Sequence, residues 1–518
     1  MFVQGSHKAL AFLAAQVLLA SVLASYNAGP PGVHLTLKPD FSPNGYKLFG
    51  TVQITDSFAA NETVALIPTT IASIRTAQYG ADDIIATDDE GIVSLSMREI
   101  PSGPFGLPSR SWVAQRATRG PVSFSFTTSP VVVNASVLPG PLFDIRKGPG
   151  GLTGSMWSLV PVPNPMSTIE YNITVSWDIP DTQAAAFTWA DGRGSHSHSF
   201  VGPVTELLQT FFIVGELDSL PAISSTGRGG NSSFGMYWLQ QQPPPFDTAE
   251  VASFLEALLA YSTEFWSDES DQPYRVFIRV NEDLGPSSRT IGAGGTALLR
   301  SFTVGYYTAG GVEAGQLRTL LAHEMTHNWT PWISGTTAEQ SRYNEGSAEY
   351  WSLRLLWRAG LLTSYEYLDE MNTRAYNYYT NSVVNMSDSA AQDVAWQIRD
   401  AQRIPYGRGM LHLTNIDARI RAATNGTGSL DTLAQEYVRK CRVTAGCGAE
   451  TWFPILKDAL GQEALDEWAR VTTGWPLIKP DAGSLGPCFN VVLNGTNPTV
   501  WVWEAKEGVD ISSAECII

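Results

Sequence analysis

The chain has 518 residues, more than one hydrophobic core usually organises, so two or three domains are expected. Hydrophobic residues make up 43% of it and charged residues only 16%, a composition that excludes a disordered chain. The formal net charge of -17 argues against nucleic acid as a partner and against stable association with an anionic membrane.

The first segment is typical of a secretory signal peptide. Lys8 precedes a nearly unbroken run of small and apolar residues at 9–24. The run is short for a membrane-spanning helix, and Val22-Leu23-Ala24 resembles a cleavage site. We expect residues 1–24 to be a signal peptide, in preference to a retained anchor, and the mature protein to be secreted into the extracellular space.

Residues 25–220 are predicted to form an N-terminal β-sheet domain. Short runs such as 34–37 and 122–126 alternate apolar with polar residues, and Gly and Pro separate them. No part of this region has the spacing of a catalytic cluster. His196 and His198 stand in a Gly/Ser-rich stretch, so we interpret them as part of a polar loop and not as a metal site.

Residues 221–480 are predicted to form the catalytic domain. A Pro/Gln-rich stretch at 240–245 is expected to mark a domain boundary, because helical periodicity begins after it. The next predicted elements are a helix (249–265), a strand (274–280), a glycine-rich turn (292–295) into a strand (296–302), and a helix (317–327). The chain then has mostly helical periodicity to about Trp475.

The last of these helices carries a His-Glu-Met-Thr-His motif. His323 and His327 are four positions apart and project from one face, about one turn from each other. Two imidazoles in this arrangement suit one zinc ion, which in a catalytic site needs a third protein ligand and an open position for water. Glu324 would then take the proton from zinc-bound water and pass it to the leaving amine.

Two carboxylates at a spacing of four follow on a second predicted helix. We interpret Glu345 as the third zinc ligand and Glu349 as the group that accepts the free ring N–H of a zinc-bound histidine, although the two could exchange roles. The alternative to a metal site is an amphipathic helix with two ordinary surface histidines. The chain has only seven histidines, and every position of the motif is filled, which favours one zinc ion per chain.

Residues 481–518 are predicted to form a small β appendage. The four cysteines are an even number and are confined to the end of the chain, which indicates disulfides: Cys441, Cys447, Cys488 and Cys516. Three connectivities are possible, and we expect the sequence-local one, in which the first cysteine pairs with the second and the third with the fourth.

Asn-x-Ser/Thr triplets recur along the chain and are predicted glycosylation sites, consistent with a secreted surface. The acceptors are Asn61, Asn134, Asn172, Asn231, Asn385, Asn425 and Asn494. A further triplet at Asn328 directly follows His327 and precedes Pro331, so we expect a structural asparagine there.

Three segments together resemble the gluzincin metallopeptidases, and among them the glycyl aminopeptidase family and its aminopeptidase N relatives. They are residues 323–329 (His-Glu-Met-Thr-His-Asn-Trp), 344–346 (Asn-Glu-Gly) and 405–409 (Pro-Tyr-Gly-Arg-Gly). The resemblance implies a multidomain α+β protein: an N-terminal β-sheet domain, a thermolysin-like catalytic domain that is mixed α/β and then α-helical, and a small disulfide-bonded appendage. It also implies that Tyr406 donates a hydrogen bond to the oxyanion, for which a neutral phenol is suitable.

The segment that would bind substrate departs from the pattern of this group. Where aminopeptidase N relatives carry a Glu for the substrate's free amine, residues 292–297 read Gly-Ala-Gly-Gly-Thr-Ala, without a carboxylate. Gly294, Gly295 and Thr296 are still predicted to bind substrate backbone, since the glycines allow close approach. The leading interpretation is a secreted zinc aminopeptidase acting on short peptides. The alternatives are a zinc endopeptidase with the same site and a catalytically idle binding protein with a peptidase fold.

Overall fold

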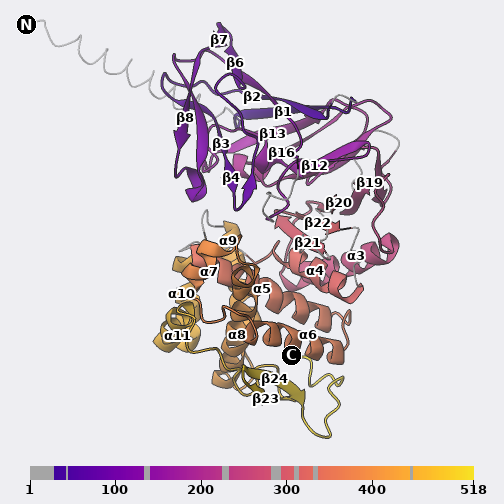
Figure 1. Ribbon diagram of the computed structural model, residues 1–518, viewed down its shortest axis with the longest axis vertical. Coiled ribbons are helices and arrows are strands. Elements are labelled where there is room, and N and C mark those ends of the chain that lie inside the picture. Colours follow the sequence, from indigo (N-terminus) through magenta and orange to yellow (C-terminus); the bar gives the residue numbers. More distant parts are fainter. Residues whose placement is uncertain are drawn as a thin grey trace, which may run out of the picture.

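The computed structural model describes residues 29–42, 45–132, 140–224, 233–281, 293–307, 314–330, 337–443 and 447–518. The predicted signal peptide at 1–24 and the predicted acceptors Asn134 and Asn231 lie outside these ranges. The chain passes from sheets in its N-terminal part to helices in its C-terminal part (Figure 1), which confirms the predicted multidomain α+β class.

A seven-stranded sheet is the largest layer of the N-terminal domain. Its strands, in spatial order, are β16 (His196–Pro203), β13 (Glu170–Trp177), β1 (Gly32–Asp40), β2 (Lys47–Ile54), β10 (Val122–Thr128), β6 (Ile85–Asp88) and β7 (Gly91–Val93). Alternate residues of β2 are buried, because one face of the sheet packs on the core and the other meets solvent. The polar loop predicted around His196 and His198 is wrong: both lie on β16, where they pair with Trp177 and Val175 of β13.

Smaller sheets accompany this layer, and the five-stranded and three-stranded ones share its core. They are the five-stranded sheet β11 (Arg146–Gly148), β12 (Gly151–Ser155), β17 (Phe211–Gly215), β14 (Ala184–Phe187), β15 (Ala190–Arg193); the three-stranded sheet β3 (Thr63–Pro68), β9 (Ser109–Ala114), β8 (Leu95–Ile100); and the pair β4 (Thr70–Ile71), β5 (Ile74–Arg75). Short helices complete the domain: α2 (Val204–Leu208) and two 3-10 turns, Pro104–Gly106 and Met156–Ser158. One apolar cluster joins Val52 of β2, Trp112 of β9 and Phe212 of β17, so these sheets form a single domain.

A second five-stranded sheet opens the C-terminal region. Its order is β18 (Leu217–Leu220), β19 (Phe234–Leu239), β20 (Tyr274–Asn281), β22 (Ser301–Tyr307) and β21 (Ala293–Leu298). Strands β19, β20 and β22 are parallel, whereas β21 runs antiparallel to β22 and forms an edge of the sheet. Helix α3 (Thr248–Phe265) joins β19 to β20, and α4 (Ala314–Thr326) follows β22.

Two expectations for this sheet are wrong. The stretch at 240–245 does not separate domains, because β18 and β19 precede it and belong to the same sheet as β20. The strand predicted at 296–302 is instead a tight hairpin of β21 and β22, with Arg300 at φ 54° in the turn. The sequence around this turn, Leu-Leu-Arg-Ser, has none of the Gly, Pro or Asn that usually mark a turn.

The N-terminal domain rests on this sheet through an apolar interface that also contains polar pairs. Phe211 of β17 clusters with Tyr237 of β19 and Phe277 of β20. The Tyr237 hydroxyl donates a hydrogen bond to Asp191 of β15 at 2.6 Å, and both residues are buried. The position of β21 and its neighbours is therefore tied to the N-terminal domain.

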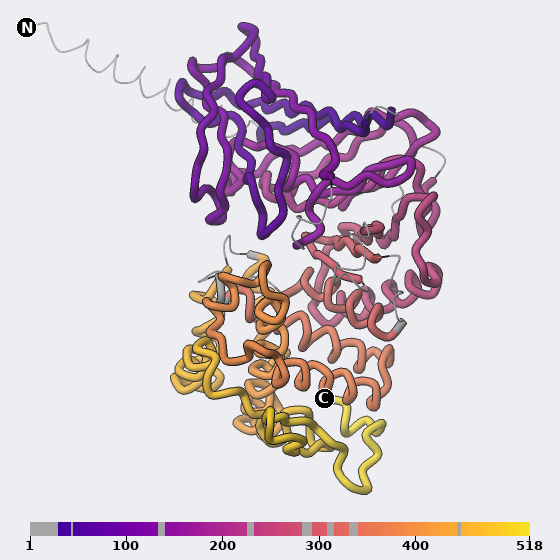
Figure 2. The backbone as a smooth tube through the Cα atoms, viewed as in Figure 1, coloured from indigo at the N-terminus to yellow at the C-terminus, as the bar shows by residue number. Residues whose placement is uncertain are grey.

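The rest of the chain is helical up to a C-terminal hairpin. The helices are α5 (Thr337–Arg358), α6 (Ser364–Tyr379), α7 (Asp388–Val394), α8 (Arg399–Ala423), α9 (Leu430–Val443), α10 (Ala449–Leu460) and α11 (Gln462–Thr472). Figure 2 shows this part at the opposite end of the molecule from the N-terminal sheets. None of the helices within the described ranges is long and apolar enough to cross a membrane.

The hairpin of β23 (Phe489–Thr496) and β24 (Thr499–Ala505) closes the chain. Disulfides join Cys441 to Cys447 and Cys488 to Cys516, which confirms the predicted sequence-local pairing. The hairpin packs into the helical core: Trp503 of β24 is buried in the same cluster as Trp351 of α5.

Candidate metal centre

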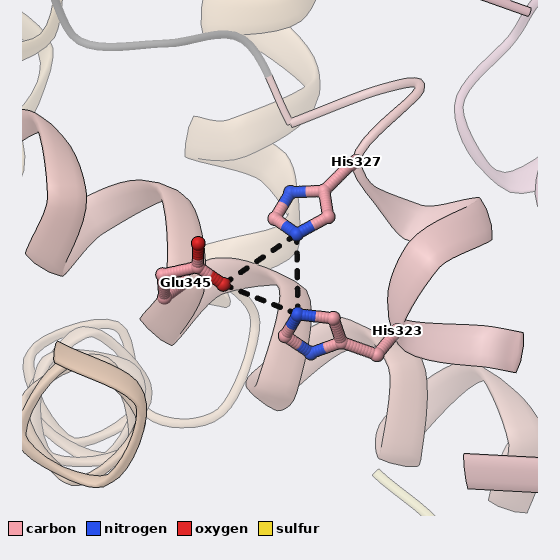
Figure 3. A group of neighbouring side chains, drawn as sticks. All are labelled: His323, His327 and Glu345. Atoms are coloured by element: carbon pink, nitrogen blue, oxygen red, sulfur yellow. Dashed lines mark hydrogen bonds and ion pairs between the residues drawn. The ribbon is translucent and has the colours of Figure 1, made fainter. Parts of the chain in front are cut away.

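Three potential ligand atoms meet at the junction of α4 and α5 (Figure 3). His323 lies in the last turn of α4, His327 directly follows that helix, and Glu345 faces both from α5. The two histidine Nε2 atoms are 3.1 Å apart, and Glu345 Oε2 lies 3.2 Å from His323 Nε2 and 3.6 Å from His327 Nε2. Within the described ranges, this is the one group of three His, Cys, Asp or Glu side chains that could hold a metal ion.

The spacing of these atoms fits a tetrahedral zinc ion. Zinc binds imidazole nitrogen and carboxylate oxygen at about 2.0–2.2 Å, so tetrahedral ligands stand about 3.3 Å from one another. The three separations of 3.1, 3.2 and 3.6 Å lie around this value. Two Nε2 atoms that face each other at 3.1 Å also need a cation or a proton between them, because an unprotonated Nε2 directs a lone pair at its neighbour. Two imidazoles with one carboxylate are a donor set of catalytic zinc sites.

Glu349 lies one turn beyond Glu345 and contacts the other side of the His323 ring. Its Oε1 is 3.3 Å from His323 Nδ1, and its Oε2 accepts a hydrogen bond from Arg374 Nε of α6 at 2.9 Å. A carboxylate at Nδ1 fixes the tautomer that leaves Nε2 free for a metal. Arg374, which also pairs with Glu370, was not identified from the sequence, because a Glu and an Arg four residues apart resemble an ordinary surface pair.

The histidines and glutamates of this site shift one another's pKa values. Burial opposes a charge on His323, but its hydrogen bonds with Glu345 and Glu349 outweigh burial and raise the pKa of His323 to about 10. Burial likewise opposes ionisation of Glu345, but the hydrogen bonds from His323 and His327 lower its pKa. The carboxylates thus favour a positive charge at the position where a cation would bind.

Glu324 lies on α4 between the two histidines and packs against the edge strand β21. Burial raises the pKa of its carboxyl, although the positive charges of His323 and His327 oppose the rise. A Cβ added to Gly295 of β21 would stand 2.3 Å from Glu324 Cγ, closer than any real contact. The predicted substrate-binding glycine therefore makes room for Glu324, a role that spacing in the sequence could not reveal.

The two neighbours of Gly295 have different surroundings. A Cβ at Gly294 would meet nothing within 4 Å, so this part of β21 is open. Thr296 Oγ1 accepts a hydrogen bond from the backbone N–H of Leu142 at 2.8 Å. The hydroxyl of Thr296 is thus engaged with the N-terminal domain.

Tyr406 of α8 completes the site, and its ring stacks on His323. The ring centroids are 5.5 Å apart and the planes meet at 16°. Helices α5 and α8 approach closely nearby: a Cβ at Gly346 would stand 2.3 Å from the Cα of Gly409. Burial first, and then the charges of Glu345 and Glu324, raise the pKa of Tyr406 well above its usual range, so the phenol remains a donor at neutral pH.

Comparison with known proteins agrees with this arrangement. No protein-family model matches the chain, and no curated protein matches its sequence. Among solved structures, the chain is similar to an aminopeptidase N family protein from Idiomarina loihiensis, with a TM-score of 0.63 and 13% identity over 89% of this chain and 79% of that one. The chain has the aminopeptidase N fold.

Two other structures with this fold are also similar to the chain. A zinc metallopeptidase from Deinococcus radiodurans, bound to a Tyr-Ser-Ala substrate, has a TM-score of 0.53 and 16% identity over 87% of this chain and 95% of that one. Leukotriene A4 hydrolase from Saccharomyces cerevisiae has a TM-score of 0.54 and 13% identity over 87% of this chain and 68% of that one. The predicted relationship to the aminopeptidase N group is confirmed at the level of the fold.

The predicted glycosylation acceptors within the described ranges all lie on the surface of this fold. They are Asn61, Asn172, Asn385, Asn425 and Asn494, each of them exposed. Asn328 is different: its Oδ1 accepts a hydrogen bond from the backbone N–H of Arg300 at 3.0 Å, as expected of a structural asparagine.

Proposed function

We propose that the chain is a secreted zinc-dependent metallopeptidase that binds one zinc ion through His323, His327 and Glu345. The triangle of their ligand atoms, with sides of 3.1, 3.2 and 3.6 Å, carries the proposal, because it matches the edges of a zinc tetrahedron. When bound, zinc acidifies a water ligand and polarises the carbonyl of the peptide bond. The two disulfides are compatible with an extracellular protein.

Glu324 and Tyr406 supply the proton chemistry in this proposal. The Glu324 carboxyl, whose pKa is raised by burial, takes a proton from the attacking water and returns it to the leaving amine. The Tyr406 phenol, which stays protonated, donates a hydrogen bond to the oxyanion that forms from the substrate carbonyl. Glu349 holds the His323 ring in the tautomer that binds zinc.

We propose further that the substrate is a short peptide, shortened from its N-terminus. The peptide would add to the outer edge of β21, where Gly294 leaves the backbone open and Gly295 makes room for Glu324. The hydrogen bond from Leu142 to Thr296 supports an exopeptidase, because the N-terminal domain then limits how far a peptide can extend along this edge. The observation in favour of an endopeptidase is that β21 carries no carboxylate to hold a free amine.

Peptide cleavage measured by mass spectrometry separates these alternatives. Each peptide would be supplied with a free and with an acetylated N-terminus, and the Glu324→Gln protein would serve as the blank. Loss of N-terminal residues from the free peptides alone is the expected result. Internal cleavage of both forms would establish an endopeptidase. No cleavage of either form would favour a binding protein that retains a peptidase fold.

The metal is tested by removing it. Chelation should abolish cleavage and one equivalent of zinc per chain should restore it, while His327→Ala should lose both zinc and activity. Full activity of zinc-free wild-type protein would contradict the mechanism.

A further inference from the structure

A buried carboxylate outside the metal centre connects the helix of Glu345 to the helix of Tyr406. Asp388 begins α7, and its Oδ1 accepts a hydrogen bond from Arg408 of α8 at 2.5 Å. Its Oδ2 lies 2.8 Å from Nε of Arg342 on α5. Arg342 stands three residues before Glu345, and Arg408 stands two residues after Tyr406. Asp388 is 4% exposed, Arg342 1% and Arg408 0%.

The remaining contacts of the two arginines hold them in place. Arg408 also donates to the backbone carbonyls of Val384 and Met386, at 2.7 Å each, in the segment that leads into α7. The Arg342 guanidinium lies 4.7 Å from the ring centroid of Trp468 on α11. Each guanidinium is therefore anchored on its own side, and the carboxylate of Asp388 is where the two anchored groups meet.

The charge balance makes this carboxylate structurally important. One negative group separates two buried positive groups, and a buried charge that loses its partner is strongly destabilising. The helices that carry these arginines are in close backbone contact beside the ion pairs: a Cβ at Gly409 would stand 2.3 Å from the carbonyl oxygen of Arg342. Loss of the charge would thus change the position of α8 relative to α5.

We propose that Asp388 is a positioning residue: by holding Arg342 and Arg408 together, it sets the place of Tyr406 beside His323 and Glu345. The inference rests on the proposed function, in which Tyr406 donates to the oxyanion. The Tyr406 ring stacks directly on the ligand His323, so a shift of α8 is transmitted to the reacting groups without an intermediate residue.

The test compares Asp388→Asn, which keeps the shape and removes the charge, with Asp393→Asn on the exposed face of the same helix. Asp388→Asn should keep zinc and KM and lose about 10- to 100-fold in kcat, the loss expected when a reacting group is displaced by about 1 Å. In a Tyr406→Phe background the same change should lower kcat by less than about twofold, because Tyr406 no longer contributes. Asp393→Asn should behave as wild type in both backgrounds.

Hydrogen exchange supplies a readout that does not depend on activity. Peptides that cover residues 342–348 and 404–410 should exchange faster in Asp388→Asn than in Asp393→Asn, with or without zinc. Equal exchange in the two variants, or equal kcat losses with and without the Tyr406 phenol, would overturn the proposal. Absence of cleavage by wild-type protein would instead contradict the proposed function and leave the exchange result standing.

A second variant keeps the proposal testable if Asp388→Asn does not fold. Arg408→Lys retains the positive charge but loses the planar fork that bonds Asp388 and two carbonyls at once. It should lower kcat in the same direction, again with little further loss in the Tyr406→Phe background. Unchanged kcat in a folded, zinc-bound Arg408→Lys protein would contradict the role of Asp388.

Discussion

The N-terminal domain and the C-terminal region fill their interiors with different side chains. Among the described residues from the N-terminus to the end of β17, the buried residues with charged side chains are Asp144 and Asp191. Both pair with arginines of β20 across the interface. The C-terminal region buries many more charged groups, including Arg342, Arg354 and Arg408.

This difference follows from how the two kinds of element are held. Strands such as β1 and β2 are spaced by backbone hydrogen bonds, so their side chains can be apolar and still define the geometry. Helices such as α5 and α8 share no backbone hydrogen bonds, so side-chain contacts and the close approach at Gly346 and Gly409 set their separation. A site assembled from helices therefore depends on paired charges, whereas the supporting sheets depend on packing.

The largest expected effect comes from the site itself. Glu324→Gln should retain zinc and the folded structure while kcat falls by about a thousandfold, because the general base is lost. Metal analysis and steady-state kinetics check both parts, and Glu256→Gln on the exposed face of α3 is the control. Substantial turnover by the zinc-bound Glu324→Gln protein would show that another group takes the proton.

A core substitution in the N-terminal domain should lower stability and leave kcat unchanged, the reverse of Glu324→Gln. Trp177 is 1% exposed and lies 5.5 Å from the ring of Phe212, so Trp177→Ala should lower the free energy of unfolding by about 3–5 kcal/mol. At a low temperature, where the variant remains folded, kcat per folded molecule should be unchanged. Denaturant unfolding, with exposed Ile92→Ala as the control, measures the loss. A kcat defect without a stability defect would contradict the separation of roles between the two regions.

Adjacent glycines of β21 allow a sharper test within the site. Gly295→Ala places a methyl group against Glu324, so kcat should fall about 10- to 100-fold through displacement of the carboxylate. Gly294→Ala adds the same methyl group in open space and should leave kcat near wild type. Kinetics with equal zinc content in both proteins checks the pair. Similar kcat values in the two variants would show that Glu324 tolerates the shift.

The sequence predicted those features that depend on short-range spacing. The histidines four residues apart, the alternation of β1 and β10, and the pairing of neighbouring cysteines all come from local pattern, and the structure has each of them. Glu345 lies beside the two histidines, as expected of a carboxylate on the helix that follows theirs.

The features that were missed depend on tertiary contacts. The contact of Gly295 with Glu324 depends on how β21 lies across α4, and Asp388 meets two arginines that are 20 or more positions away along the chain. The turn at Arg300 was missed because its left-handed backbone is held by surroundings, including the Asn328 side chain, and not by a turn residue.

The smallest expected effect concerns pH and belongs to the N-terminal domain. Burial, aided by the charge of Glu170, raises the pKa of Glu206 on α2 to about 7 from an ordinary value of 4.5. The folded protein thus holds this proton more tightly than the unfolded chain does, and the stability that it contributes is complete below about pH 4.5. That contribution is lost as the pH rises through about 7. Glu345 has the opposite pH dependence, because its pKa is lowered and its contribution to stability is lost as the pH falls.

Glu206→Gln removes this titration while keeping the shape of the side chain. The midpoint of thermal unfolding of the variant, relative to wild type, should therefore rise as the pH is raised from 5 to 8, by a few degrees at most because the group is partly exposed. Glu170→Gln should move the wild-type loss to lower pH, since it removes the neighbouring charge that helps to raise the pKa. Parallel profiles for the Glu206→Gln and wild-type proteins would mean that Glu206 is ionised at no cost in the folded domain.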